Sequence, residues 1–83
     1  MTLTPQATPE DRPPLAEVVH RNIQSELALA GMKRIDLQKA LDVAPMYLQR
    51  RYTMGTEWAW GDVEKIADWL HIDESKLTNR RPI

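Results

Sequence analysis

Residues 33–55 read KRIDLQKALDVAPMYLQRRYTMG, and this stretch decides the fold because it holds two helix patterns joined by a short break. Leu37 and Leu41 lie four residues apart, as one face of a helix requires. Asp42 stands where the first helix must end in a left-handed conformation, which Asp tolerates through local side-chain hydrogen bonds. Pro45 suits the first position of a helix, where no backbone N–H is needed. The stretch therefore predicts two short helices with a tight corner between them.

Apolar residues at helical spacing predict further helices on both sides of this pair. The stripe before the pair consists of Leu15, Val19, Ile23, Leu27 and Ala30, and Gly31 is the expected residue after its end. The stripe after the pair consists of Trp60, Val63, Ile66, Ala67 and Leu70. Asp73 can cap a short fifth helix that ends near Thr78. With the pair at residues 34–41 and 45–53, the sequence predicts an all-α, compact five-helix bundle.

Three tryptophans occur within a short part of the chain. Trp60 lies on the apolar stripe and is expected to be buried. Trp58 lies in the loop before it, where it can pack over the helix of residues 45–53 or flank a phosphate. Trp69 falls to the side of the stripe, and partial burial by the C-terminal turn is expected; if exposed, it is a candidate anchor for self-association.

The composition indicates a single small domain. The chain has 83 residues, of which 42% are apolar and 28% charged, and it has no Cys, which excludes a disulfide framework and a Cys-based zinc site. No apolar run approaches the ~20 residues that span a bilayer, so a soluble, cytoplasmic protein is expected. Residues 1–14 hold four of the six prolines and are interpreted as a disordered arm. Residues 15–78 are predicted to form the domain, and residues 79–83 a short tail.

The charge of the chain is uneven. The net charge is −1, yet residues 33–51 hold five basic and two acidic side chains, a local charge of +3. The residues before and after this segment each sum to −2. A basic patch on one motif of an otherwise acidic chain is typical of contact with nucleic acid, although chance clustering of surface charge gives the same pattern.

Residues 33–55 resemble the helix-turn-helix of the lambda-repressor-like (XRE) family, and they are most similar to the small Cro-like and immunity-repressor domains of actinobacterial phages. The matching elements are core positions Leu37, Leu41, Val43 and Leu48, the run YLQRRY at residues 47–52, and the run VEKIADWLHI at residues 63–72. The resemblance covers residues 15–78. It implies a fold in which the second helix of the motif, the third of the chain, enters the major groove of DNA.

Three positions depart from the pattern of this family. The family usually has Gln, Ala and Gly at the places that Arg34, Gln38 and Asp42 occupy here. Gln38 carries a long polar side chain to the contact between the two helices, so it is expected to bend outward or to find a hydrogen-bond partner.

The motif assigns candidate DNA contacts to the outward residues of these helices. The candidate base contacts are Pro45, Met46, Gln49 and Arg50. Arg can pair with guanine, Gln can pair with adenine, and an apolar side chain can touch a thymine methyl group. The candidate phosphate contacts are Lys33, Arg34, Tyr47, Arg51 and Thr53. For two of the base contacts, Pro45 and Met46, a plain helix start and a surface apolar residue are equally compatible. Arg51 is equally compatible with an intramolecular role, and Tyr52 is expected in the core.

No catalytic, metal-binding or cofactor-binding pattern is found. His20 and His71 have no further ligand at suitable spacing, and His71 suits the end of a helix. Ser25 and Ser75 have no nearby base, and no Gly-rich phosphate loop is present. We therefore expect no enzyme and no small-molecule ligand.

Two functions remain open at the level of the sequence. The first is a transcriptional regulator that binds double-stranded operator DNA, a Cro-like repressor, with homodimerisation in solution or only on DNA left open; an antitoxin or restriction controller belongs to the same class. The alternative is a protein-interaction module on a degenerate helix-turn-helix fold, which net acidity, Met46 and Gln38 favour.

Overall fold

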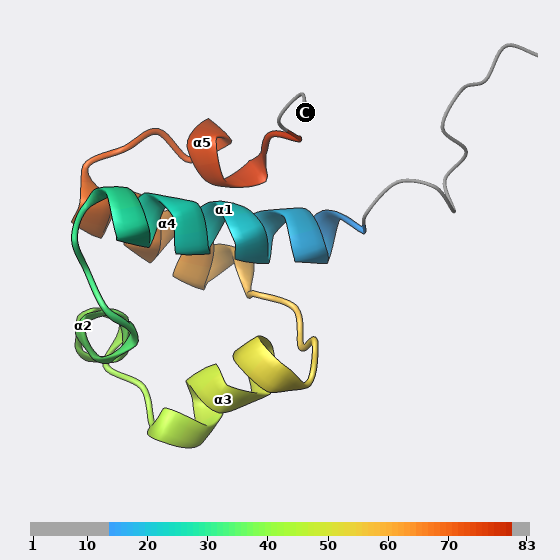
Figure 1. The fold of residues 1–83 in the computed structure, drawn as a ribbon, viewed down its shortest axis with the longest axis vertical. Coiled ribbons are helices and arrows are strands. Elements are labelled where there is room, and N and C mark those ends of the chain that lie inside the picture. Colours follow the sequence, from blue (N-terminus) through green and yellow to red (C-terminus); the bar gives the residue numbers. More distant parts are fainter. Residues whose placement is uncertain (1–13, 81–83) are drawn as a thin grey trace, which may run out of the picture.

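The structure is a computed structural model that describes residues 14–80. The described residues contain helices and no strand, which confirms the all-α class. In chain order the five helices are α1 (Leu15–Leu29), α2 (Arg34–Leu41), α3 (Pro45–Thr53), α4 (Trp60–Leu70) and α5 (Ser75–Thr78) (Figure 1). The predicted arm at residues 1–14 lies outside the described residues except for Pro14, and the predicted tail is described only at residues 79 and 80.

The ends of the helices follow the local chemistry that the sequence indicated. Asp42 ends α2 in the left-handed conformation with a φ of 55°, and Gly31 follows α1 with a φ of 71°. Pro45 occupies the first turn of α3. Before α5, the carboxylate of Asp73 accepts the backbone N–H of Ser75 at 2.9 Å, while the N-cap position itself is held by Glu74.

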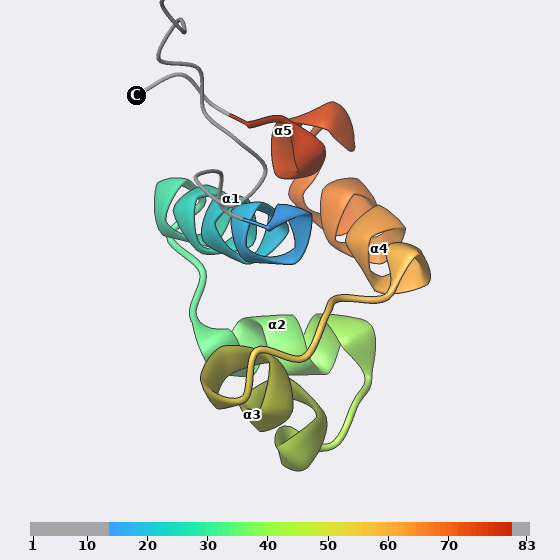
Figure 2. The same ribbon diagram turned by 90° about the vertical axis from the view of Figure 1, so that its right-hand side faces the viewer.

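The contacts between helices centre on α1 and α4. α1 packs against α4 and α5, and α2 packs against α4. In both ribbon views α3 lies beside α2 at the lower edge of the molecule, away from α1 and α5 (Figures 1 and 2). α3 thus has one face toward the bundle and a broad face toward solvent.

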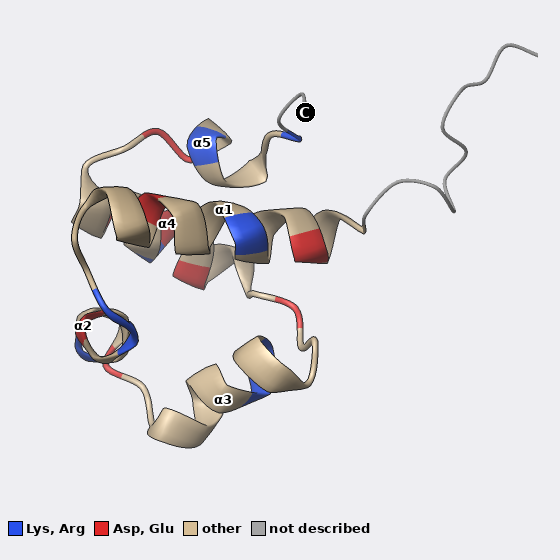
Figure 3. Cartoon of the chain, in the orientation of Figure 1, with Lys and Arg blue, Asp and Glu red and all other residues tan. Residues whose placement is uncertain are grey.

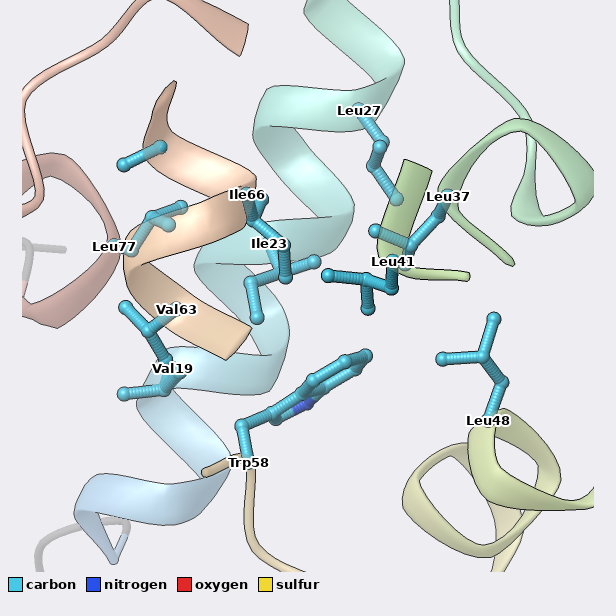
Figure 4. Packing of buried hydrophobic residues seen from close by; sticks show 11 residues of the cluster. Val19, Ile23, Leu27, Leu37, Leu41, Leu48, Trp58, Val63, Ile66 and Leu77 are labelled. Atoms are coloured by element: carbon cyan, nitrogen blue, oxygen red, sulfur yellow. The ribbon is translucent and has the colours of Figure 1, made fainter. Parts of the chain in front are cut away.

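One hydrophobic cluster holds these elements together. Its buried members are Val19, Ile23, Leu27, Leu37, Leu41, Leu48, Trp58, Val63, Ile66, Ala67 and Leu77. Leu48 is the buried residue of α3, and Trp58 reaches into the cluster from the loop between α3 and α4 (Figure 4). A polar contact adds to the cluster at α5, because the amide of buried Asn22 donates to the carbonyls of Leu77 and Asn79 at 3.0 and 2.8 Å.

Burial along the predicted apolar stripes differs in part from the prediction. Trp60 was expected in the core and is 58% exposed, while Trp58, two residues earlier, is buried. The reason is that Trp60 is the first residue of α4, at the rim of the bundle, and Trp58 has already filled the space beside α1. Leu15 is likewise exposed, because it begins α1, and Ala30 is exposed after its end. Trp69 is partly buried as expected, but it shares a hollow with residues of α2 rather than with the C-terminal turn.

Candidate nucleic-acid interface

The first half of α3 presents the candidate base contacts to solvent. Pro45, Met46, Gln49 and Arg50 are all exposed. Leu48, on the opposite face, is fully buried in the core. The helix therefore has one face packed in the core and the opposite face exposed to solvent, as binding in a DNA groove requires. The structure brings these four side chains together on one exposed face of α3.

The candidate phosphate contacts at the start of α2 are also exposed. Lys33 is the residue before the helix, and its backbone N–H is satisfied by the carboxylate of Asp36 at 2.8 Å. The guanidinium carbon of Arg34 lies 4.5 Å from the centre of the Tyr52 ring. Arg34 is thus directed toward α3 by a cation–π contact while it remains accessible.

Unlike the exposed residues at the start of α2, Arg51 and Tyr47 both make contacts within the protein. The guanidinium carbon of Arg51 lies 3.6 Å from the centre of the Tyr47 ring, and its terminal NH1 group donates to the Tyr47 carbonyl at 3.0 Å. The hydroxyl of Tyr47 donates to the carboxylate of Asp62 on α4. This hydrogen bond is the main reason why the pKa of Tyr47 is raised above its usual range. Both side chains are only partly exposed.

Thr53, the last candidate phosphate contact, is exposed at the end of α3. Its hydroxyl donates to the carbonyl of Gln49 at 2.7 Å, one turn earlier. The candidate phosphate contacts therefore divide into exposed side chains on α2 and side chains on α3 that already make hydrogen bonds inside the chain.

A cluster of rings behind α3 was not visible from the sequence. The Nδ1 atom of His20 accepts the indole N–H of Trp58 at 3.1 Å, so His20 is neutral with its proton on Nε2. The same imidazole meets Tyr52 edge to face, with ring centres 5.0 Å apart. Burial lowers the pKa of His20, which favours this neutral form. These residues come from α1, α3 and the loop before α4, so no spacing in the sequence could reveal the contact.

The described part of the chain offers neither a candidate metal site nor a helix that could span a membrane. Among residues 14–80 no group of three His, Cys, Asp or Glu side chains is arranged to hold a metal ion. No helix within the same residues is long and apolar enough to cross a membrane.

Comparison of the chain with family models, with curated proteins and with solved structures finds no match. The resemblance to lambda-repressor-like domains therefore rests on the residues of the sequence alone.

Proposed function

We propose that this protein is a sequence-specific regulator that binds double-stranded DNA through α3 in the major groove, in the manner of a small Cro-like repressor. The observation that carries the proposal is the exposed face formed by Pro45, Met46, Gln49 and Arg50 on a helix whose opposite face is anchored by Leu48. Of the eleven Lys and Arg residues of the chain, five fall within residues 33–51, just before or on α2 and on α3, and Figure 3 shows further basic residues on α1 and α5.

The chemistry of this face suits base edges. The guanidinium of Arg50 can donate two parallel hydrogen bonds to the O6 and N7 atoms of guanine. The amide of Gln49 can pair with the N6 and N7 atoms of adenine, and Met46 can contact a thymine methyl group. Discrimination of this kind needs rigid presentation, which the hydrogen bond from Tyr47 to Asp62 supplies at the start of α3.

The start of α2 suits a phosphate. The positive end of the α2 dipole favours an anion, and Lys33 and Arg34 add two exposed cations there. Contacts of this kind fix the register of the protein on the duplex and carry no sequence information. Repression then follows from occupancy of an operator that overlaps a promoter. Helix-turn-helix proteins commonly bind such sites as dimers, which we include in the proposal.

The direct test is selection of binding sites from randomised duplexes by the purified protein, followed by anisotropy titrations at several salt concentrations. We expect a defined site. The logarithm of affinity is expected to fall against the logarithm of salt with a slope of roughly −4 to −5 per protomer. A slope near zero, or no enriched site, would contradict DNA binding and favour a protein-interaction module instead.

Two variants and one control separate the roles of the residues. Arg50→Ala should cost about 1–3 kcal/mol on the selected site and remove the preference at one base pair. Lys33→Ala should weaken all sequences alike and reduce the salt slope by about 1. Arg21→Ala is the matched control, because Arg21 is an exposed arginine on α1 that pairs with Glu17 at 2.9 Å. If Arg50→Ala left the selection profile unchanged, the assignment of a base contact would be wrong.

A further inference from the structure

Trp60 forms the centre of a second surface that DNA binding does not use. Its side chain is 58% exposed, and it lines two hollows in the surface, of about 270 and 420 Å³. We call this region the Trp60 surface and define it by its exposed members Leu15, Glu57, Trp60, Glu64, Asp73 and Glu74. Exposed aromatic side chains beside a hollow are typical of contact sites between proteins.

The apolar part of the Trp60 surface is preformed. The first hollow is lined by Leu15 and Trp60, which are exposed, and by Val19 and Trp58, which belong to the buried core. Trp58 is further held by its hydrogen bond to His20. A rigid apolar hollow loses little entropy when a side chain enters it, so it can serve as an anchor point.

The charged side chains of the Trp60 surface are all negative. Every charged side chain that lines the two hollows is acidic, namely Glu57 in the first and Glu64, Asp73 and Glu74 in the second. Hydrogen bonds from Ser75 hold the pKa of Asp73 below its usual range, so this group is ionised at neutral pH. Carboxylates around an apolar centre complement a segment that carries Lys or Arg beside apolar residues, and they repel phosphates.

We propose that the Trp60 surface binds a basic, apolar segment of another protein. The segment would place an aliphatic or aromatic side chain in the hollow beside Leu15. Its Lys or Arg side chains would meet the four carboxylates, and a guanidinium could also cover the exposed Trp60 ring. The surface spans the starts of α1 and α4 and the start of α5, whereas the candidate base contacts lie on α3 at the lower edge of the molecule (Figure 2). Both surfaces can therefore be occupied at once, and this inference does not depend on DNA binding.

The test is a selection from a displayed library of random peptides with the full-length purified protein as bait. We expect enriched peptides that combine Lys or Arg with large apolar residues. Trp60→Ala should weaken their binding about tenfold or more, as truncation of an anchoring Trp commonly does. The thermal midpoint of the Trp60→Ala variant should stay close to that of the parent protein because the Trp60 side chain is largely exposed. A double variant, Glu57→Gln with Glu64→Gln, should weaken binding severalfold and reduce its dependence on salt.

The control and the opposing outcomes are well defined. Leu29→Ala removes another exposed apolar side chain, 77% exposed at the opposite end of α1, and should change nothing. The proposal is overturned if no peptide is enriched, if the enriched peptides are acidic, or if Trp60→Ala leaves their affinity unchanged. It is equally overturned if binding requires deletion of residues 2–13, since the chain itself would then occupy the surface. A dimer that Trp60→Ala converts to a monomer in sedimentation would identify a second copy as the occupant.

Discussion

His20 shows how one side chain can connect three elements. It lies on α1, accepts the indole N–H of Trp58 from the loop before α4, and meets the ring of Tyr52 on α3. Two cations also face this cluster, because Arg34 lies over Tyr52 and the Arg51 guanidinium lies 5.8 Å from the Trp58 ring centre. The carboxylate of Glu17, one turn earlier on α1, lines the same hollow as His20 and is paired with Arg21. A second proton on His20 would therefore remove the acceptor for Trp58 and add a charge beside two others.

The free energy of unfolding is expected to depend on pH through His20. Burial in the folded protein lowers the pKa of His20 below its ordinary value of 6.5. The unfolded chain therefore takes up the proton first as the pH falls. The contribution is fully present above about pH 6.5 and is lost as the pH falls toward the lower pKa of the folded state. Urea denaturation at intervals between pH 7.5 and 5 should thus show a decreasing free energy of unfolding. His20→Asn keeps an acceptor near the indole but cannot titrate, so its stability should change less over this interval.

The control for this titration is His71→Asn. His71 is exposed at the end of α4 with a φ of 57°, a conformation that Asn tolerates. This variant removes the other histidine of the chain, so comparison of the two variants assigns the decline to one histidine or to the other. An equal decline in His20→Asn and in the parent would show that another group causes the effect.

At the scale of single residues, the sequence predicted helix ends better than it predicted burial. Gly31, Asp42 and Pro45 act through their own backbone, so their roles follow from residue type and position. Burial of a loop residue depends on the path of the chain, which no local spacing encodes. For this reason burial was predicted for Trp60 and left open for Trp58, and the partners of His20 and Tyr47 were missed.

Among the elements, α3 depends most on individual side-chain contacts. It adds Leu48 to the core, and it is joined to α4 by the hydrogen bond between Tyr47 and Asp62. Asp62 is only 8% exposed, so its carboxylate needs this partner. Arg51, packed on the Tyr47 ring, reinforces the same contact. The geometry of the candidate DNA-binding face is thus set by residues that need not touch DNA.

Tyr47→Phe tests the contact between α3 and α4. Loss of the hydroxyl leaves a buried carboxylate without this hydrogen bond, at a cost of about 1–3 kcal/mol in the free energy of unfolding. Calorimetry should show a thermal midpoint lowered by roughly 4–8 °C for each kcal/mol. Tyr52→Phe is the matched control on the same helix, because the buried Tyr52 hydroxyl has no hydrogen-bond partner within residues 14–80. Equal stability of the two variants would mean that the Tyr47 hydroxyl does not hold α3 in place.

The helices were accessible from the sequence because periodic apolar residues mark α1, α2 and α4 and residue types at the ends mark α1, α2, α3 and α5. The predicted ranges 34–41 and 45–53 coincide with α2 and α3. The direction in which α3 points was not accessible, since it follows from Tyr47, Asp62 and Trp58 meeting across elements. The outward face of α3 could be predicted only because Leu48 marks the inward one.

In the whole molecule, the hydrophobic core extends from the second turn of α1 to α5. Its buried cluster begins at Val19 and ends at Leu77, so every member lies within the described helices or the loop before α4. The C-terminal end is needed because Leu77 is fully buried and because the carbonyls of Leu77 and Asn79 accept the amide of Asn22.

Deletion of residues 2–13 should therefore leave the domain folded. This segment holds three of the six prolines and Leu3 as its only large aliphatic residue, so it offers little apolar surface to bury. We expect a thermal midpoint within a few degrees of the full chain, since the loss of a contact worth ~1 kcal/mol would already lower it by about 4–8 °C. Affinity for a selected DNA site should be unchanged or slightly higher, because Glu10 and Asp11 outnumber Arg12. Truncation after Glu74 is the contrasting variant: it removes Leu77 from the core and should lower the midpoint strongly or unfold the protein. If the first deletion unfolded the domain, the boundary of the folded unit would lie before residue 14.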